Sequence, residues 1–350
     1  MRSHGPKYAI AKCILIVNQR LTKAIHVFKG TAVDVKVEGA KDSGIEINTT
    51  GTRHLGAAVG TEKFKAEYVN TKIDGWILAL KKLSAIATSQ PHAAFSAFTQ
   101  CMQSQWTFLS RSMPEISPLL ARLEDVIRLC FLPALLRRPV NDFEREVLSL
   151  PARMGGLGIS LPHINCISAH ANSLKVSAPL IRLIARQELD LDPRELATQV
   201  KHLRAQIDES ADKDQALKLQ QLIERADDGM KFALKVSAEK GASSWVTATP
   251  LYDHGTVLHK GDFVDAVYMR YGWTLPDLPV RCGCQQAAFS LQHALDCKTG
   301  GYRTIQHNEV RDVCSLARAL STRQPTRKMM REVTSKSMGF GGRCDRRFSM

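Results

Sequence analysis

The sequence predicts a mainly α-helical protein that carries a small α+β piece at its N-terminus. Apolar residues recur at steps of three and four through most of residues 61–240, which is the period of an amphipathic helix. Short β-branched segments of alternating polarity are confined to the first 60 residues. Beyond residue 245 the pattern becomes mixed and turn-rich, so we expect a small separate module there.

Composition limits the class of protein. A chain of 350 residues suits about two domains, and a hydrophobic content of 44% is enough for ordinary cores. The net charge of +14 and the pI near 9.5 favour RNA or DNA as a partner. Part of that charge is local, because the eight Lys and Arg residues in 322–350 exceed two acidic residues by six.

The cysteines and the apolar segments indicate the compartment. Nine cysteines at irregular spacing do not form a disulfide framework in a chain of this length, so we expect reduced thiols. The N-terminus lacks an apolar signal core, and the best apolar run, residues 14–17, is far too short to span a bilayer. We therefore expect no membrane association and a location in the nucleus or the cytoplasm.

The first 60 residues predict strands and one helix. Residues 12–17 have the β-branched, apolar character of a buried strand, and residues 21–28 have helical spacing. Residues 33–37 and 45–47 alternate in polarity, so each predicts a strand with one solvated face. Three glycines within residues 51–60 indicate a turn and a close backbone approach, but their spacing excludes a dinucleotide-binding or P-loop motif.

Three helices are expected between residue 61 and Pro133. The second begins near Pro91 with Ser89 as its cap, and the third runs from Ser117 to Phe131, where Pro133 ends it. Aromatic residues on these helices have the spacing of a core face, which we prefer to base stacking. The two principal stripes are Phe64, Tyr68, Ile73, Trp76, Ile77, Leu80 and Leu83, then Phe95, Phe98, Met102, Trp106 and Leu109.

A capping box and a glycine-rich loop follow. Asn141 and Glu144 have the spacing of a capping box at a helix start. The loop at residues 150–159 places Arg153 beside Gly155 and Gly156. This loop either presents backbone N–H groups and a guanidinium group to a phosphate, or it is a plain turn between helices.

Residues 163–241 are helical and highly charged in pattern. Leucine and isoleucine recur at helical steps in residues 199–240, with Lys, Glu and Asp on the other faces. This stretch predicts a helical hairpin. A coiled-coil arm is the alternative, but no a/d pattern holds there for three heptads.

Four potential metal ligands lie within residues 281–300. Cys282, Cys284, His293 and Cys297 have the spacing Cys-x-Cys-x8-His-x3-Cys, and three thiolates with one imidazole suit a structural, tetrahedral zinc ion. We expect Gly283 to form the turn between the first two ligands. A helix would bring His293 and Cys297 to one face and end at residues 300–301. The alternative is three free cysteines and a packed histidine, because the gap between the first two cysteines is short.

Several separated blocks of the chain resemble reverse transcriptases of non-LTR retrotransposons. The metal-ligand cluster, a Gly-Gly turn and the sequence HNEVRD at 307–312 are similar to the knuckle in their C-terminal region. The loop LPARMGGLGI at 150–159 resembles an element downstream of their thumb. Residues 5–17 with GTRHLG at 51–56 resemble the end of their palm, and residues 258–273 resemble the segment before their knuckle.

This resemblance implies a domain organisation. Residues 1–60 correspond to the end of the palm with a primer-grip-like turn, and residues 61–175 to a helical thumb. Residues 176–245 form a charged helical connector, residues 246–320 a mixed region with the zinc knuckle, and residues 321–350 a basic disordered tail. Three helices followed by the loop at 150–159 fit a thumb, which closes over the template–primer duplex.

The resemblance also implies roles for single residues. Lys12 corresponds to a lysine that faces the incoming triphosphate, and Arg53 and His54 correspond to residues that contact the primer end. By the same resemblance Arg153, Gly155 and Gly156 contact the nucleic-acid backbone. Magnesium is expected only in a complete parent polymerase.

The catalytic carboxylates of that family have no counterpart here. The triplet Ala226-Asp227-Asp228 resembles the box that binds two magnesium ions. It lies within a charged helical run after the thumb, and the box requires a tight hairpin between apolar strands before it, so we assign it to a solvated face. The nuclease motif of an Asp followed by Glu/Asp-x-Lys also has no match after Asp312.

The sequence therefore predicts a fragment of a retroelement RNA-directed DNA polymerase that binds template–primer nucleic acid and is catalytically incomplete by itself. The alternative is a host-adopted, zinc-binding nucleic-acid adaptor protein without enzymatic activity. A translated pseudogene without a selected role is a third interpretation.

Overall fold

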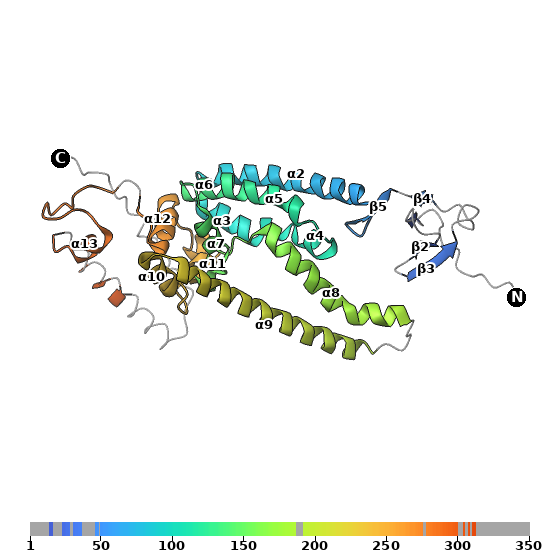
Figure 1. Cartoon of the computed structure of the whole chain (residues 1–350). Coiled ribbons are helices and arrows are strands. Elements are labelled where there is room, and N and C mark those ends of the chain that lie inside the picture. The colour runs from blue at the N-terminus through green and yellow to red at the C-terminus, as the bar shows by residue number, and fades with distance from the viewer. Residues whose placement is uncertain are drawn as a thin grey trace.

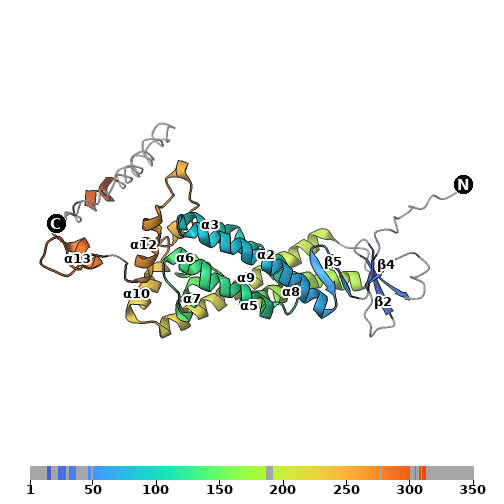
Figure 2. The same ribbon diagram turned by 90° about the horizontal axis from the view of Figure 1, so that it is seen from above.

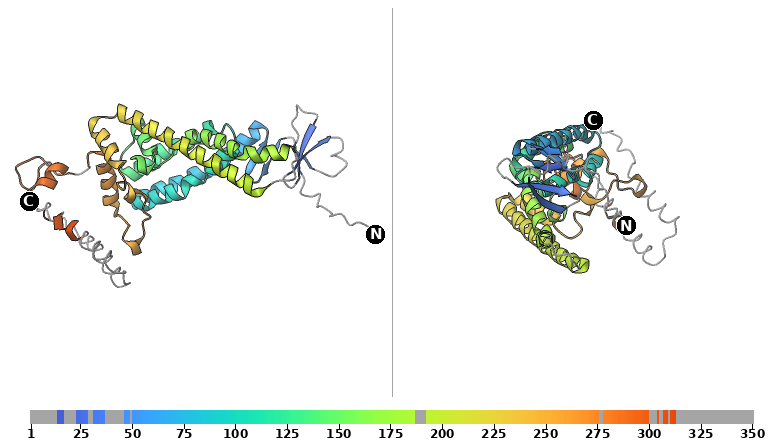
Figure 3. Two further views of the ribbon diagram at one scale, coloured as in Figure 1. Left: turned by 90° about the horizontal axis from the view of Figure 1, so that it is seen from below. Right: turned by 90° about the vertical axis from the view of Figure 1, so that its right-hand side faces the viewer.

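The computed structural model describes four strands within residues 14–48 and then residues 50–186, 192–275 and 278–299, with isolated helical positions between 304 and 312. The described chain is mainly α-helical with short strands near its N-terminus, as the sequence predicted. The N-terminal strands and helix α13 (Leu291–Asp296) lie at opposite ends of an elongated helical body (Figure 1; Figure 2). The right-hand panel of Figure 3 shows the same body from one end, viewed down its long axis.

A four-stranded sheet precedes the helices, in the order β3-β2-β1-β4. Strand β1 (Ile14–Ile16) pairs antiparallel with β2 (Lys23–Phe28) and parallel with β4 (Glu46–Asn48), and β2 pairs antiparallel with β3 (Thr31–Lys36). The helix expected at residues 21–28 is therefore wrong. A short apolar run has no decisive period, and the hairpin with β3 provides six cross-strand partners that a helix would lack.

The glycine-rich segment at residues 51–60 forms a second, two-stranded hairpin of β5 (Gly51–His54) and β6 (Ala57–Gly60). Its turn residues Leu55 and Gly56 both have positive φ, 48° and 91°, as a two-residue hairpin turn requires. A Cβ atom on Gly60 would lie 2.3 Å from Cα of Gly51, so the close backbone approach expected here is present. The tyrosine hydroxyl of Tyr68 donates to the Gly56 carbonyl at 2.7 Å and ties the hairpin to the first long helix.

Helices α2 (Glu62–Ala87) and α3 (Pro91–Gln100) follow, then η2 (Met102–Ser104) and α4 (Thr107–Ser112). Thr61 caps α2 by accepting a hydrogen bond from the Phe64 N–H. The cap position of α3 is Gln90, which makes no side-chain cap bond. The prediction that Ser89 caps this helix is wrong, because its hydroxyl donates to the Ile86 carbonyl of the preceding turn.

The aromatic stripes predicted as core are mostly buried. Phe98 and Trp106 are 0% and 4% exposed, and their ring centroids lie 6.2 Å apart. Phe98 also stacks on Phe131 from the third helix, with 4.6 Å between the centroids. The described residues that complete these stripes are buried or pack against the same core: Phe64, Tyr68, Ile73, Trp76, Ile77, Leu80, Leu83, Phe95, Met102 and Leu109.

The third helix continues beyond the point where Pro133 was expected to end it. Helix α5 (Ser117–Val126) passes through a π-helical turn, η3 (Ile127–Phe131), into α6 (Leu132–Leu136). The π turn shifts the hydrogen bonds, so that the Leu132 N–H donates to Ile127, and Pro133 enters at the start of α6, where a missing N–H is tolerated. The helix ends instead at Arg137, which has a left-handed backbone with φ 57°.

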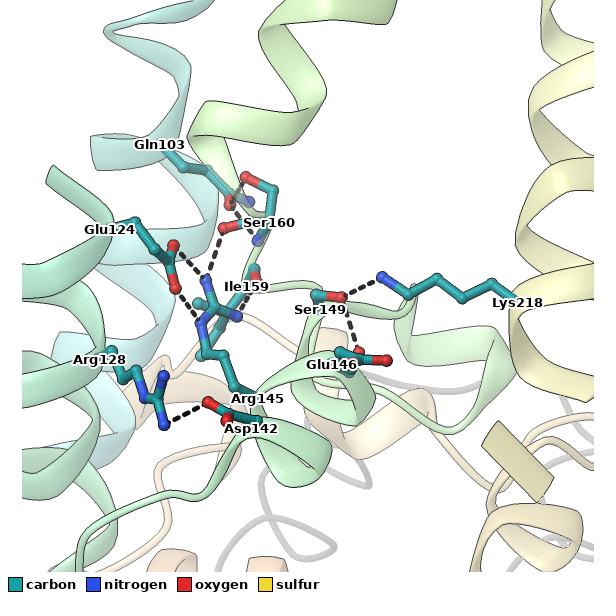
Figure 4. A network of polar contacts seen from close by, with 10 residues as sticks. All are labelled: Gln103, Glu124, Arg128, Asp142, Arg145, Glu146, Ser149, Ile159, Ser160 and Lys218. Atoms are coloured by element: carbon teal, nitrogen blue, oxygen red, sulfur yellow. Dashed lines mark hydrogen bonds and ion pairs between the residues drawn. The ribbon is translucent and has the colours of Figure 1, made fainter. Parts of the chain in front are cut away.

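Helix α7 (Asp142–Ser149) begins with the predicted capping box. The Asn141 side chain accepts from the Glu144 N–H at 2.9 Å, and Glu144 accepts from the Asn141 N–H at 3.0 Å. One turn later Arg145 is almost completely buried and forms an ion pair with Glu124 of α5 (Figure 4). Its remaining N–H groups donate to the carbonyls of Ile159 and Ser160, at 2.8 and 2.9 Å.

The charged region forms a helical hairpin, but not within residues 199–240 as predicted, because residues 199–225 belong to a single helix. Helix α8 (Pro162–Arg186) packs against α9 (Pro193–Arg225), which is one uninterrupted helix of 33 residues (Figure 1). The expected boundary between residues 175 and 176 falls inside α8. Helix α10 (Asp228–Ser237) follows α9 after a break at Ala226 and Asp227.

Helix α12 (Lys260–Tyr271) closes the core beside α10 after two short turns, α11 (Ser244–Thr247) and η5 (Tyr252–His254). Its residues Phe263, Val264 and Val267 are buried, and the Tyr268 hydroxyl donates to the Leu136 carbonyl at 2.9 Å. The packing of α12 against α3 and α6 joins the C-terminal half of the chain to the first three helices.

Replacement of Arg145 by Ala should lower the free energy of unfolding by about 3–5 kcal/mol, because it leaves the buried carboxylate of Glu124 unpaired. The matched control is Arg122→Ala, which removes an exposed ion pair with Asp74 and should cost less than about 1 kcal/mol. Urea denaturation followed by circular dichroism measures both. Equal losses in the two variants would contradict the role assigned to the buried pair.

Candidate metal centre and nucleic-acid interface

The four predicted metal ligands are held by a small hairpin and a short helix. The hairpin spans residues 280–289 and is closed by the bond from the Phe289 N–H to the Val280 carbonyl, at 3.1 Å. Within it the Cys282 N–H donates to Ala287, and the Gln285 N–H donates back to Cys282 at 2.8 Å. This tight turn brings the Cys282 and Cys284 side chains to the same side.

The left-handed residue of this turn is Gln285, with φ 62°. Gly283, expected to supply the turn conformation, does not have positive φ, and a Cβ atom there would meet nothing within 4 Å. Gly283 nevertheless lies in the turn between the two cysteines, as expected, because the bond from the Gln285 N–H to the Cys282 carbonyl makes Gly283 and Cys284 its two central residues. The backbone reversal occurs one residue beyond Cys284, where the chain turns back towards Ala287.

Helix α13 and the residue that follows it supply the other two ligands. Ser290 caps the helix by accepting a hydrogen bond from the His293 N–H at 3.0 Å, which fixes the first turn. The helix ends at Asp296, and Cys297 is its C-terminal cap with an extended backbone. His293 and Cys297 thus meet across a helix end, not on one helical face, and residues 300–301, expected to end the helix, lie outside the described residues.

The ligand atoms of Cys282, Cys284, His293 and Cys297 all lie within 4.8 Å of one another. The Cys282 and Cys297 sulfur atoms are 3.7 Å apart. Two sulfurs bound to one tetrahedral zinc at about 2.3 Å lie about 3.8 Å apart, so this spacing fits. The Cys284 sulfur and Nε2 of His293 are 3.3 Å apart, close to the sulfur–nitrogen separation of the same geometry. Three sulfurs and one imidazole at these distances suit zinc.

The protonation state of Cys284 also suits metal binding. The Gln286 N–H, followed by the imidazole of His293, lowers the pKa of the Cys284 thiol to about 6. The same contact with Cys284 raises the pKa of His293. A thiol that is largely ionised at neutral pH is ready to bind a cation, because the thiolate is the form that acts as ligand.

The glycine-rich loop at residues 150–159 is tied into the core. The N–H groups of Gly155 and Gly156 donate to the carbonyls of Ala152 and Pro151, at 3.1 and 3.2 Å, so neither points at a ligand. A Cβ atom on Gly156 would lie 2.0 Å from the Leu150 carbonyl oxygen, which explains the glycine. These contacts favour the plain-turn interpretation for the two glycines.

Two residues of α12 complete this loop, and no pattern in the sequence indicated them. The buried Arg270 donates from Nη2 to the carbonyls of Ala152 and Gly156, at 3.1 and 3.2 Å. The Tyr271 hydroxyl donates to the Gly155 carbonyl at 3.0 Å, and complete burial raises its pKa to about 12. More than 100 residues separate the two segments, and helical spacing alone cannot reveal such a pairing.

Of the residues predicted to contact nucleic acid, three have exposed side chains. Arg53 and His54 end strand β5 beside Leu55, which is 85% exposed at the hairpin tip. Arg153 is exposed and paired with Asp212 of α9 at 2.6 Å. Lys12 lies outside the described residues. The hairpin and α13 lie at opposite ends of the helical body, so the structure does not combine them in one site (Figure 1).

Comparison of the chain with protein-family models, curated proteins and solved structures gave no match. Among the described residues, no helix is both long and apolar enough to cross a membrane.

Replacement of Cys284 by Ser should reduce bound zinc from about one ion per chain to a small fraction, since a structural zinc site needs its four ligands. The matched control is Cys101→Ser, which changes an exposed free cysteine remote from the cluster in sequence and should keep the metal. Metal analysis of protein purified with zinc in the medium measures the ratio. Wild-type protein that binds no zinc would contradict the assignment.

Proposed function

We propose that this chain is part of a retroelement RNA-directed DNA polymerase, in which a thumb-like helical domain and a zinc knuckle bind template–primer nucleic acid. The observation that carries the proposal is the arrangement of Cys282, Cys284, His293 and Cys297 as one set of zinc ligands. This set stands after a helical domain and a loop whose sequences resemble that family in the same order.

The physical case for a knuckle rests on its size. A segment of about 20 residues cannot bury enough apolar surface to be stable alone, and a metal supplies the missing stabilisation. Zinc bound by the four residues would fix the turn at Gln285 and the helix α13 relative to each other. The hairpin would then present Arg281, which is exposed, on a rigid support to a phosphate.

The exposed hairpin of β5 and β6 supplies a second contact. Arg53 and His54 offer a cation and a ring donor, and Tyr68 anchors the turn to α2 through the Gly56 carbonyl. This anchoring favours a contact with the primer end, where a rigid turn holds the strand in register. The net charge of +14 supplies general attraction to a polyanion.

We assign no catalysis to the chain alone. Asp227, within the triplet that resembles a metal box, caps α10 by accepting from the Met230 N–H at 2.8 Å. A helix cap cannot present two carboxylates to two magnesium ions as a strand hairpin does. Magnesium therefore belongs to a complete parent polymerase. In a primer-extension assay with magnesium the purified chain should give no product, and template-dependent synthesis would contradict this assignment.

Replacement of Arg53 by Ala should weaken binding of an RNA–DNA duplex and reduce the slope of log K against log salt by about one, because one phosphate contact is lost. The control Lys240→Ala changes another exposed cation, next to α10, and should leave the slope unchanged. Fluorescence anisotropy over a salt series measures both.

Cys284→Ser should also weaken binding of the same duplex, because the knuckle would lose the metal that holds Arg281 on a rigid support. A wild-type chain that retains zinc but does not bind the duplex would refute the proposed function. Equal salt-dependence slopes for wild type and Arg53→Ala would exclude the contact through the β5–β6 hairpin, but not the contact through the knuckle.

A further inference from the structure

Helix α8 has apolar residues on two opposite faces. Its inner face, which includes the half-buried Ala169, Val176 and Leu183, packs with its neighbours α4, α5 and α9. On the outer face the side chains of Ile164, Ile167 and Leu174 are 51%, 63% and 53% exposed. A helix that is apolar on all sides is normally covered on all sides, so the outer face needs a partner.

The outer face has the pattern of a two-helix seam. Its members recur at alternating steps of three and four residues: Ile164, Ile167, Ala171, Leu174, Ala178, Ile181 and Ala185. This is the a/d spacing of a coiled coil, sustained through about three heptads. Ile181 is 53% exposed, like the residues at the start of the seam, so the exposed stripe runs along most of the helix.

The seam alternates large and small side chains. After Ile164 each first position is alanine, and each second position is isoleucine or leucine. If two copies paired in parallel, Ala171 would face Ala171 and Ala178 would face Ala178, and each pair would leave a void. If they paired antiparallel about a point between residues 172 and 173, Ala171 would face Leu174 of the second copy and Ala178 would face Ile167. In each central layer a large side chain then faces a small one, so that no void remains.

We propose that α8 is a dimerisation helix, which pairs antiparallel with α8 of a second copy of this chain. The same register also keeps the cations of the two helices apart. Helix α8 carries cations and no acidic residue. The antiparallel register places Lys175 beside Ser168 and Arg182 beside Leu161 of the second copy, so no two cations meet at the closest approach. The seam is about 33 Å long at 1.5 Å per residue.

Sedimentation or light scattering of the whole chain tests this pairing. Wild-type protein should reach twice the chain mass of 38.8 kDa as its concentration rises. Leu174→Asp should lose the dimer and keep its helical circular dichroism, because the side chain is exposed in the single chain. The matched control Leu217→Asp changes a leucine that is 55% exposed on α9, and it should remain dimeric. A wild-type chain that stays monomeric, or a dimeric Leu174→Asp variant, would overturn the proposal.

Photo-cross-linking tests the direction of the pair. A benzophenone amino acid in place of Ile164, mixed with isotope-labelled wild-type chain, should form an intermolecular adduct with the labelled tryptic peptide at residues 176–182. An adduct with the labelled peptide that contains residue 164 would mean a parallel pair and would overturn the antiparallel arrangement.

Discussion

The fold depends on the buried guanidinium group of Arg145. It donates to Glu124 of α5 at 2.6 and 2.9 Å, and to two carbonyls just before α8. One side chain of α7 thus joins the third helix to the point where the chain enters its long hairpin (Figure 4). A buried ion pair of this kind adds little net stability over an apolar pair, but its geometry fixes a single arrangement. The position of α8, and through it of α9, follows from this contact.

A second buried arginine holds the other side of the same loop. Arg270 of α12 donates to Ala152, Gly156 and the Ser243 hydroxyl. The loop at residues 150–159 therefore lies between two guanidinium groups, one from α7 directly before it and one from α12, more than 100 residues away. Its glycines allow this close packing, and the only cation that the loop itself offers to solvent is Arg153. A conformational role explains Gly155 and Gly156 without any ligand.

Much of the helical fold was predictable because its signals are local. The Asn141–Glu144 capping box and the core aromatics both follow from spacing within one or two turns. Strand β2 was not predictable, because a short apolar segment becomes a strand only when β3 pairs with it. Pro133 was misjudged for a related reason, since the π turn that admits it depends on packing of the whole helix.

The metal centre was likewise predictable only in part. The ligand types and their spacing indicated Cys282, Cys284, His293 and Cys297, and the structure brings them together. The means by which they meet was not predictable, because Gln285 takes the left-handed conformation and Cys297 lies beyond the end of α13. The buried Arg270 and Tyr271 gave no sequence signal, since their partners are more than 100 residues away.

The central claim is that these four residues bind one zinc ion and fix the knuckle. X-ray absorption at the zinc edge of the purified chain tests it most directly. The account predicts three sulfur neighbours at about 2.3 Å and one nitrogen neighbour at about 2.0–2.1 Å. Zinc surrounded only by oxygen and nitrogen atoms would contradict it.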